Sequence, residues 1–282
     1  MKVRRGDGSV IAVEVAGEQG AAPVLLCHGL ADSRLSARLF SQAAGELGLC
    51  IVAPDRPGVG GTDLRRLGRL ADWVEDAALV PDAVAAGPVA VLGISAGGPF
   101  AAACAARVPG RVRSLTLVCP LGPPGWPTRE MAPGERLSLA VARHAPAFGG
   151  WFLGRLAALA RPGHHGCSSA LPPASCPAST AARSPSPACA RRSWPAMPRR
   201  SAAAARGAAQ DLRVLTRPWG FQLGSITVPA SIHHGDADTT VPPRHARLYA
   251  EAIPGAQLQL YPGHGHFSIL AAAREILAPL AR

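Results

Sequence analysis

The sequence predicts an α/β protein in which helices cover both faces of a mostly parallel sheet. Short apolar runs, typical of buried strands, alternate along the chain with segments of helical composition. Most of these runs are continuously apolar, as expected for parallel strands that are buried on both faces. The expected strands are residues 10–15, 23–27, 49–53, 89–92, 112–119, 226–233 and 257–261.

Helices are expected between these strands. Residues 35–47, the Ala-rich segment 96–107 and residues 244–253 have helical composition, and a last helix begins near Ile269. One or two further helices are expected within 137–160, where apolar residues supply one face: Trp151, Phe152, Leu153, Leu156 and Leu159.

The bulk composition is that of a packed globular protein. Of the 282 residues, 48% are apolar and 17% are charged. The first residues are basic but precede no apolar run, and no apolar stretch approaches the roughly 18 residues of a membrane span. We therefore expect a cytoplasmic protein with no membrane partner.

The net charge of +11 is concentrated in one part of the chain. Residues 136–210 contain ten Arg and no Lys, Asp or Glu, whereas the remainder holds 19 basic and 18 acidic residues. Because the rest of the chain is almost neutral, we expect no nucleic-acid partner. The seven Cys have no paired spacing typical of disulfides or zinc, and Cys27, Cys50, Cys104 and Cys119 are expected to be buried small hydrophobes.

Residues 161–200 have no hydrophobic period. Pro, Ser, Ala, Arg and Cys alternate there without an apolar face, which is typical of a disordered loop. The same composition is also typical of a GC-rich gene segment that is translated out of frame before the correct reading frame is restored. Resequencing the gene would test this interpretation. A metal site at His164, His165 and Cys167 is a third interpretation, although that spacing fits no common zinc pattern.

The strongest chemical signal is Gly93-Ile94-Ser95-Ala96-Gly97, a G-x-S-x-G motif between a strand and a helix. So tight a turn holds the serine in a strained conformation, and Gly93 and Gly97 must lack side chains to let the chains pass. Ser95 would then be a nucleophile at a helix N-terminus, where partial positive charge favours a developing oxyanion.

A serine nucleophile needs a base and an acid that orients the base. Where the serine lies in a G-x-S-x-G turn, the acid follows it along the chain and the histidine comes last. Two loops that follow strands offer them: Asp236 or Asp238, then His264 or His266. Both loops should emerge at the same edge of the sheet as Ser95.

With these motifs the chain resembles the α/β-hydrolase superfamily, close to its bacterial esterase and perhydrolase-like branch. The family's acid loop G-x-x-D-x-x-V-P falls on Gly235–Pro242 and implies that Asp238 is the acid, with Asp236 capping the turn. The family's G-H-[FS] element falls on Gly265-His266-Phe267 and implies that His266 is the base.

The resemblance also implies an oxyanion hole. His28-Gly29-Leu30 is similar to the family's H-G turn, in which the backbone N–H groups of Leu30 and Ala96 would bind the oxyanion. His28 would then steady the turn rather than act as a second base. The Asp55–Gly60 segment resembles the family's D-R-P-G-x-G loop and is interpreted as architecture.

The resemblance covers 1–122 and 207–282 as two parts of one core. Residues 123–206 would be an irregular helical cap insertion, in which 123–160 fit the first half of a cap and 161–206 are not recognisable as the second half. The implied function is hydrolysis of a carboxylic ester through an acyl-enzyme at Ser95, with no cofactor and no metal. A perhydrolase or a C–C hydrolase on the same triad, and a non-catalytic or damaged relative, remain alternatives. The oligomeric state and the acyl and alcohol groups are not indicated.

Overall fold

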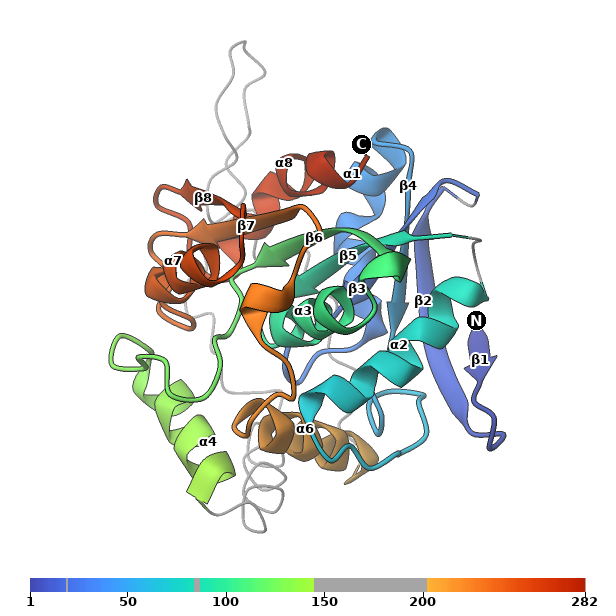
Figure 1. Cartoon of the computed structure of the whole chain (residues 1–282), viewed down its shortest axis with the longest axis horizontal. Coiled ribbons are helices and arrows are strands. Elements are labelled where there is room, and N and C mark those ends of the chain that lie inside the picture. The colour runs from blue at the N-terminus through green and yellow to red at the C-terminus, as the bar shows by residue number, and fades with distance from the viewer. Residues whose placement is uncertain (19, 84–86, 145–201, 282) are drawn as a thin grey trace, which may run out of the picture.

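The computed structural model describes residues 1–18, 20–83, 87–144 and 202–281 (Figure 1). These residues form an eight-stranded sheet with the order β1-β2-β4-β3-β5-β6-β7-β8. The strands are β1 (Lys2–Arg4), β2 (Val10–Gly17), β3 (Ala22–Cys27), β4 (Leu49–Pro54), β5 (Val89–Ile94), β6 (Val112–Val118), β7 (Ala230–Gly235) and β8 (Gln257–Tyr261). β1 and β2 are antiparallel to their neighbours and the other strands are parallel, as the apolar runs predict.

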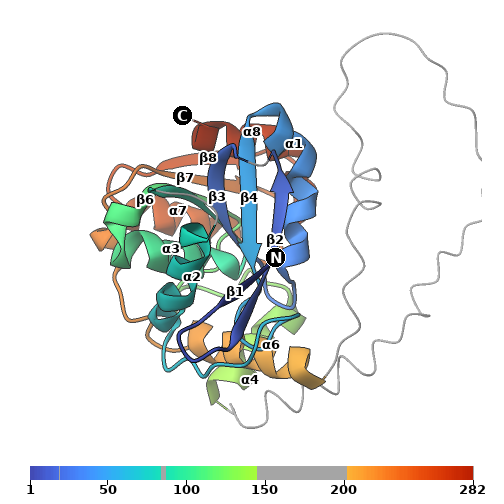
Figure 2. The ribbon, with the colours of Figure 1, turned by 90° about the vertical axis from the view of Figure 1, so that its right-hand side faces the viewer.

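Helices cover both faces of this sheet. On one face α1 (Ser41–Glu46) packs against α8 (Ala273–Leu277), whereas α2 (Trp73–Asp82), α3 (Gly97–Arg107) and α7 (Pro243–Ala252) cover the other. Figure 2 shows the strands between α1 on one side and α2 and α3 on the other. Two separate apolar clusters result, one on each face of the sheet. Continuous burial of β4 and β5 explains why their sequences do not alternate.

Two further helices lie together beyond one end of the sheet, α4 (Pro133–His144) and α6 (Ala202–Leu215) (Figures 1 and 2). α6 crosses the boundary predicted between residues 206 and 207. Residues 145–201 lie outside the described residues, and with them the expectations for 161–200 and for His164, His165 and Cys167. Within the described ranges, no helix has the length and apolar character needed to cross a membrane.

Some elements differ from those expected. β7 begins at Ala230 rather than at residue 226, because Ile226 closes a 3-10 turn (Leu223–Ser225) and Pro229 has no N–H to donate to a ladder. The segment 35–47 is divided into a 3-10 helix (Arg34–Phe40) and α1. β1, which is too short to show a period, and α2 were not predicted from the sequence.

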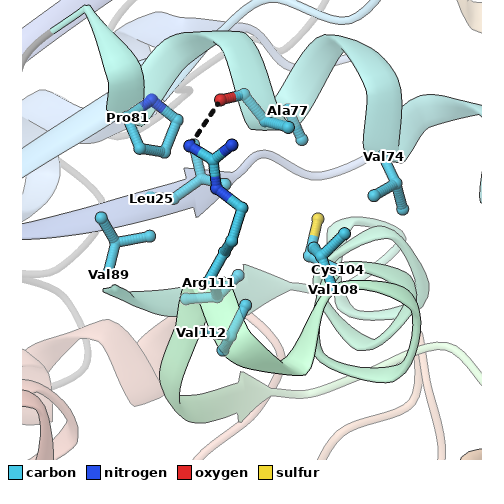
Figure 3. Close-up of a pocket in the computed structure, with 11 residues that line it drawn as sticks. Leu25, Val74, Ala77, Pro81, Val89, Cys104, Val108, Arg111 and Val112 are labelled. Carbon is cyan, nitrogen blue, oxygen red and sulfur yellow. Dashed lines mark hydrogen bonds between the residues drawn. The ribbon is translucent and has the colours of Figure 1, made fainter. Parts of the chain in front are cut away.

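The packing of α2 on the sheet leaves a small apolar gap next to α3, with a volume of about 20 Å³ (Figure 3). Val74, Val89 and Cys104 are among its lining residues. The Arg111 guanidinium borders the gap and donates to the carbonyl oxygen of Ala78 at 3.5 Å. The residues that line the gap are mostly apolar, and their atoms lack contacts there that a larger side chain could supply.

Candidate active site

Ser95 occupies the turn between β5 and α3 in a left-handed conformation, with φ at 54°. Its N–H donates to the carbonyl of Val118 at 2.8 Å, and its own carbonyl accepts from Gly98 at 3.0 Å and Leu121 at 3.1 Å. A non-glycine residue is strained in this region, and the three hydrogen bonds hold it there. The result is a serine displayed at the carboxyl edge of the sheet.

The two glycines of the motif allow this turn to form. A Cβ at Gly97 would overlap the carbonyl oxygen of Cys27, and one at Gly93 would lie 2.6 Å from the Ala101 Cβ. Both approaches are far closer than van der Waals contact allows. The glycines therefore let α3 approach both β5 and the end of β3.

His266 and Asp238 meet Ser95 from the loops after β8 and β7. The Nε2 atom of His266 lies 2.9 Å from Ser95 Oγ, and its Nδ1 lies 2.7 Å from Asp238 Oδ2. With Nδ1–H donating to the carboxylate, Nε2 is free to accept the serine proton. The three residues predicted from the motifs thus form one continuous hydrogen-bonded chain.

Asp238 is buried but well supplied with donors. Its Oδ1 accepts the N–H groups of Thr240 at 2.8 Å and Val241 at 3.0 Å, and His234 Nε2 lies 3.3 Å from Oδ2. Burial by itself raises the pKa of this carboxyl, but the hydrogen bonds from His234 and His266 outweigh it and hold the pKa below its usual value. Asp238 is therefore ionised at neutral pH and able to stabilise an imidazolium.

The strand that ends at His28-Gly29 brings a backbone turn next to Ser95. His28 is fully buried, its Nδ1–H donates to the Gly29 carbonyl at 2.9 Å, and its Nε2 accepts the Arg56 N–H at 3.3 Å. Burial and the nearby Arg56 charge lower the pKa of His28 well below its usual value, so its ring is neutral. Among the described residues, the N–H groups of Leu30 and Ala96 donate to no other group, which leaves both available to a ligand oxygen.

Comparisons with known proteins identify the family of this chain. A model of the family described as the alpha/beta hydrolase fold matches residues 22–273. The chain belongs to this family. No curated protein matches the sequence significantly.

Solved structures resemble this α/β hydrolase along nearly its whole length. An esterase from Exiguobacterium antarcticum has a TM-score of 0.66 at 19% identity, with 99% of this chain and 97% of that chain covered. The enol-lactonase from Burkholderia xenovorans LB400 has a TM-score of 0.68 at 17% identity, with 98% of each chain covered. A bromoperoxidase from Bacillus anthracis has a TM-score of 0.64 at 18% identity, with 99% and 96% covered. At these identities the likeness shows the fold.

The alternative acid and base of this α/β hydrolase make other contacts. Asp236 Oδ1 accepts the Gly263 N–H at 2.7 Å and so caps the turn between β8 and the histidine loop. His264 Nδ1 lies 3.0 Å from the Pro262 carbonyl, within its own turn. The structure therefore brings Asp238 and His266, rather than these neighbours, to the nucleophile.

Sequence reasoning did not find all of the residues around the site. Cys119, expected only as a buried hydrophobe, lies beside Asp238; burial first, and then that carboxylate, raises the pKa of its thiol well above the usual value. Its position directly after β6, at the edge where Ser95 emerges, was the available signal. His234 gave no such signal, because a histidine inside an apolar strand is indistinguishable from a structural one.

Cys119, Asp238 and His266 are also residue types that bind metals, and one ligand atom of each lies within 4.8 Å of the others. Both imidazole nitrogens of His266 are engaged, however, one with Asp238 and the other with Ser95. The cluster is therefore better described as a hydrogen-bonded support of the serine than as a set of free ligands.

Proposed function

We propose that this α/β hydrolase cleaves carboxylic esters through an acyl-enzyme at Ser95. The observation that carries the proposal is the Ser95–His266–Asp238 chain, with its distances of 2.9 and 2.7 Å. A serine hydroxyl is a weak nucleophile, and an oriented imidazole at hydrogen-bond distance is what activates it. The esterase and enol-lactonase among the similar structures give further support, since a lactone is a cyclic ester.

In the acylation step, Ser95 Oγ forms a bond to the ester carbonyl carbon while His266 Nε2 takes the hydroxyl proton. The N–H groups of Leu30 and Ala96 bind the carbonyl oxygen as it becomes an oxyanion. The carbonyl re-forms, the bond to the alcohol oxygen breaks, and the imidazolium gives its proton to that oxygen. Asp238 stabilises the imidazolium throughout.

In the deacylation step a water molecule takes the place of the alcohol. His266 accepts a proton from this water, whose oxygen attacks the acyl carbon. The second tetrahedral intermediate then collapses, the carboxylic acid leaves, and the proton returns to Ser95 Oγ. No redox step occurs, so the triad needs only water as co-substrate.

Perhydrolysis is the alternative that a specific observation favours, because a bromoperoxidase has a similar structure. Hydrogen peroxide would replace water in deacylation and release a peroxy acid. The acylation step is identical, so a substrate panel with and without peroxide separates the two activities.

Intact-mass labelling with a fluorophosphonate, beside Ser95→Ala, tests the proposal directly. We expect one adduct per wild-type chain and none in the variant, because the reagent requires an activated serine and an oxyanion hole. Hydrolysis of short-chain aryl esters should disappear together with the label. A folded wild-type protein that takes up no label would refute the proposal and favour a non-catalytic relative.

A further inference from the structure

We infer that Asp211, on α6, is a positioning residue for the oxyanion turn and acts through Arg56. The inference rests on the proposed function of Ser95 and adds a residue that none of the motifs includes. Its basis is a chain of contacts that runs from α6 through Arg56 to the turn at His28-Gly29.

Arg56 holds this turn through two backbone carbonyls. Its NH1 donates to the carbonyl of His28 at 2.5 Å and its NH2 donates to the carbonyl of Gly29 at 2.8 Å. The peptide that joins Gly29 to Leu30 contains the second of these carbonyls, and its other end is the Leu30 N–H. Because a peptide is planar and trans, a fixed Gly29 carbonyl aims that N–H in the opposite direction.

Asp211 in turn fixes Arg56. Its Oδ2 accepts from Arg56 Nε at 2.9 Å and from NH2 at 2.8 Å, and both side chains are almost fully buried. The guanidinium also lies over the Phe100 ring of α3, 4.6 Å from its centroid. Restraint from the carboxylate, the ring and the turn leaves the guanidinium one orientation, in which NH1 points to the His28 carbonyl.

The ion pair is poorly suited to a purely stabilising role. Asp211 Oδ1 has no hydrogen-bond partner among the described residues, and burial raises the pKa of this carboxyl despite the opposing Arg56 charge. Buried ion pairs contribute little net stability, because the loss of hydration offsets their attraction. Precise orientation of Arg56 is the property that this arrangement does supply.

Two neighbouring residues of α6, Gly207 and Gln210, fix the position of the helix near Asp211. A Cβ at Gly207 would lie 2.5 Å from the Gly58 carbonyl oxygen, so only glycine permits this approach of the helix to the loop after β4. Gln210, next to Asp211, accepts the Leu67 N–H at 3.1 Å and donates to the Arg65 carbonyl at 2.9 Å. The helix is thus anchored at Gly207 and at Gln210, close to the carboxylate.

Asp211→Asn tests the inference, and Asp76→Asn is the matched control. Asp76 is a second buried carboxylate with arginine partners, Arg5 at 2.8 and 3.0 Å and Arg65 at 3.2 Å, and neither arginine contacts the oxyanion turn. In Asp211→Asn we expect kcat for an aryl ester to fall about tenfold with KM within about twofold, less than the roughly 100- to 1000-fold typical of losing a donor outright. Asp76→Asn should lower Tm but leave kcat unchanged.

Hydrogen–deuterium exchange supplies a readout that does not depend on turnover. Amides in the peptide covering 28–31 should exchange faster in Asp211→Asn than in the wild type, and at the wild-type rate in Asp76→Asn. Unchanged exchange in Asp211→Asn, or a kcat loss equal in both variants, would overturn the inference. If the wild type takes up no fluorophosphonate while Asp211→Asn still exchanges faster, the positioning role stands and the proposed function falls.

Discussion

At the residue scale, neighbouring side chains of the same type have different roles in the candidate site. Asp236 and Asp238 are two positions apart, yet one caps a turn through Gly263 and the other bonds to His266. Composition does not distinguish these carboxylates, and only the resemblance to the family's acid loop favours Asp238. Their different burial and donors give them different roles, and the hydrogen bonds to Asp238 hold the pKa of its carboxyl below the usual value.

Paired substitutions of these two residues make this difference measurable. We expect Asp238→Asn to reduce kcat on the order of 10⁴-fold, because the imidazole is then held in the wrong tautomer and its cation is not stabilised. Asp236→Asn keeps an acceptor for the Gly263 N–H and should stay within about threefold of wild type, since it touches no reacting group. Steady-state kinetics on one aryl ester compares them; equal losses would contradict the assignment of Asp238.

At the element scale, the strands and the turns after them position the three triad residues and the oxyanion turn. β3, β5, β6, β7 and β8 are successive parallel neighbours, so the turns after them meet at one edge of the sheet. The same packing leaves the small apolar gap beneath α2 (Figure 3). A larger side chain that fills such a gap should stabilise the packing of the elements around it.

Val89→Ile should fill part of this gap. The valine is buried and lines the gap, so an added methylene gains roughly 0.8 kcal/mol of unfolding free energy by burial without displacing neighbours. Val24→Ile is the matched control on β3, because Val24 is fully buried on the other face and does not line the gap. Overpacking there should cost about 1–3 kcal/mol. Thermal melts should move in opposite directions; a lower Tm for Val89→Ile would contradict the expected filling.

At the scale of the whole molecule, buried neutral histidines couple stability to pH. Burial lowers the pKa of His233 to about 4, and burial also lowers the pKa of His28 and His245. Between the unfolded value near 6.5 and the folded value, the unfolded chain binds more protons than the native protein. Unfolding free energy therefore falls as pH drops through this window.

We expect the melting temperature to decrease as pH falls from about 6.5 to about 4, with His233 alone contributing up to about 3 kcal/mol. His233→Gln should make the decrease shallower, because glutamine can still pair with the Tyr261 hydroxyl but does not titrate. Scanning calorimetry at several pH values measures both slopes. Parallel curves for the two proteins would show that His233 does not contribute.

The sequence by itself determined the parallel sheet and the proposed catalytic residues, because local sequence patterns predict both. Continuous apolar runs mark β4 and β5, and G-x-S-x-G with its flanking strand and helix identifies Ser95. Family motifs placed the acid and base at Asp238 and His266, which are the residues that the structure brings to the serine. Each of these patterns involves only residues that lie a few positions apart in the sequence.

Only the tertiary structure decided which distant groups support that chemistry. Arg56 and Asp211 are 155 residues apart, and no local period connects a loop after β4 with a helix that begins at Ala202. Cys119 likewise gains its place beside Asp238 from strand order rather than from its neighbours in sequence. Contacts of this kind depend on how helices and loops pack around the sheet edge, and that packing reflects side-chain shape and charge across the whole fold.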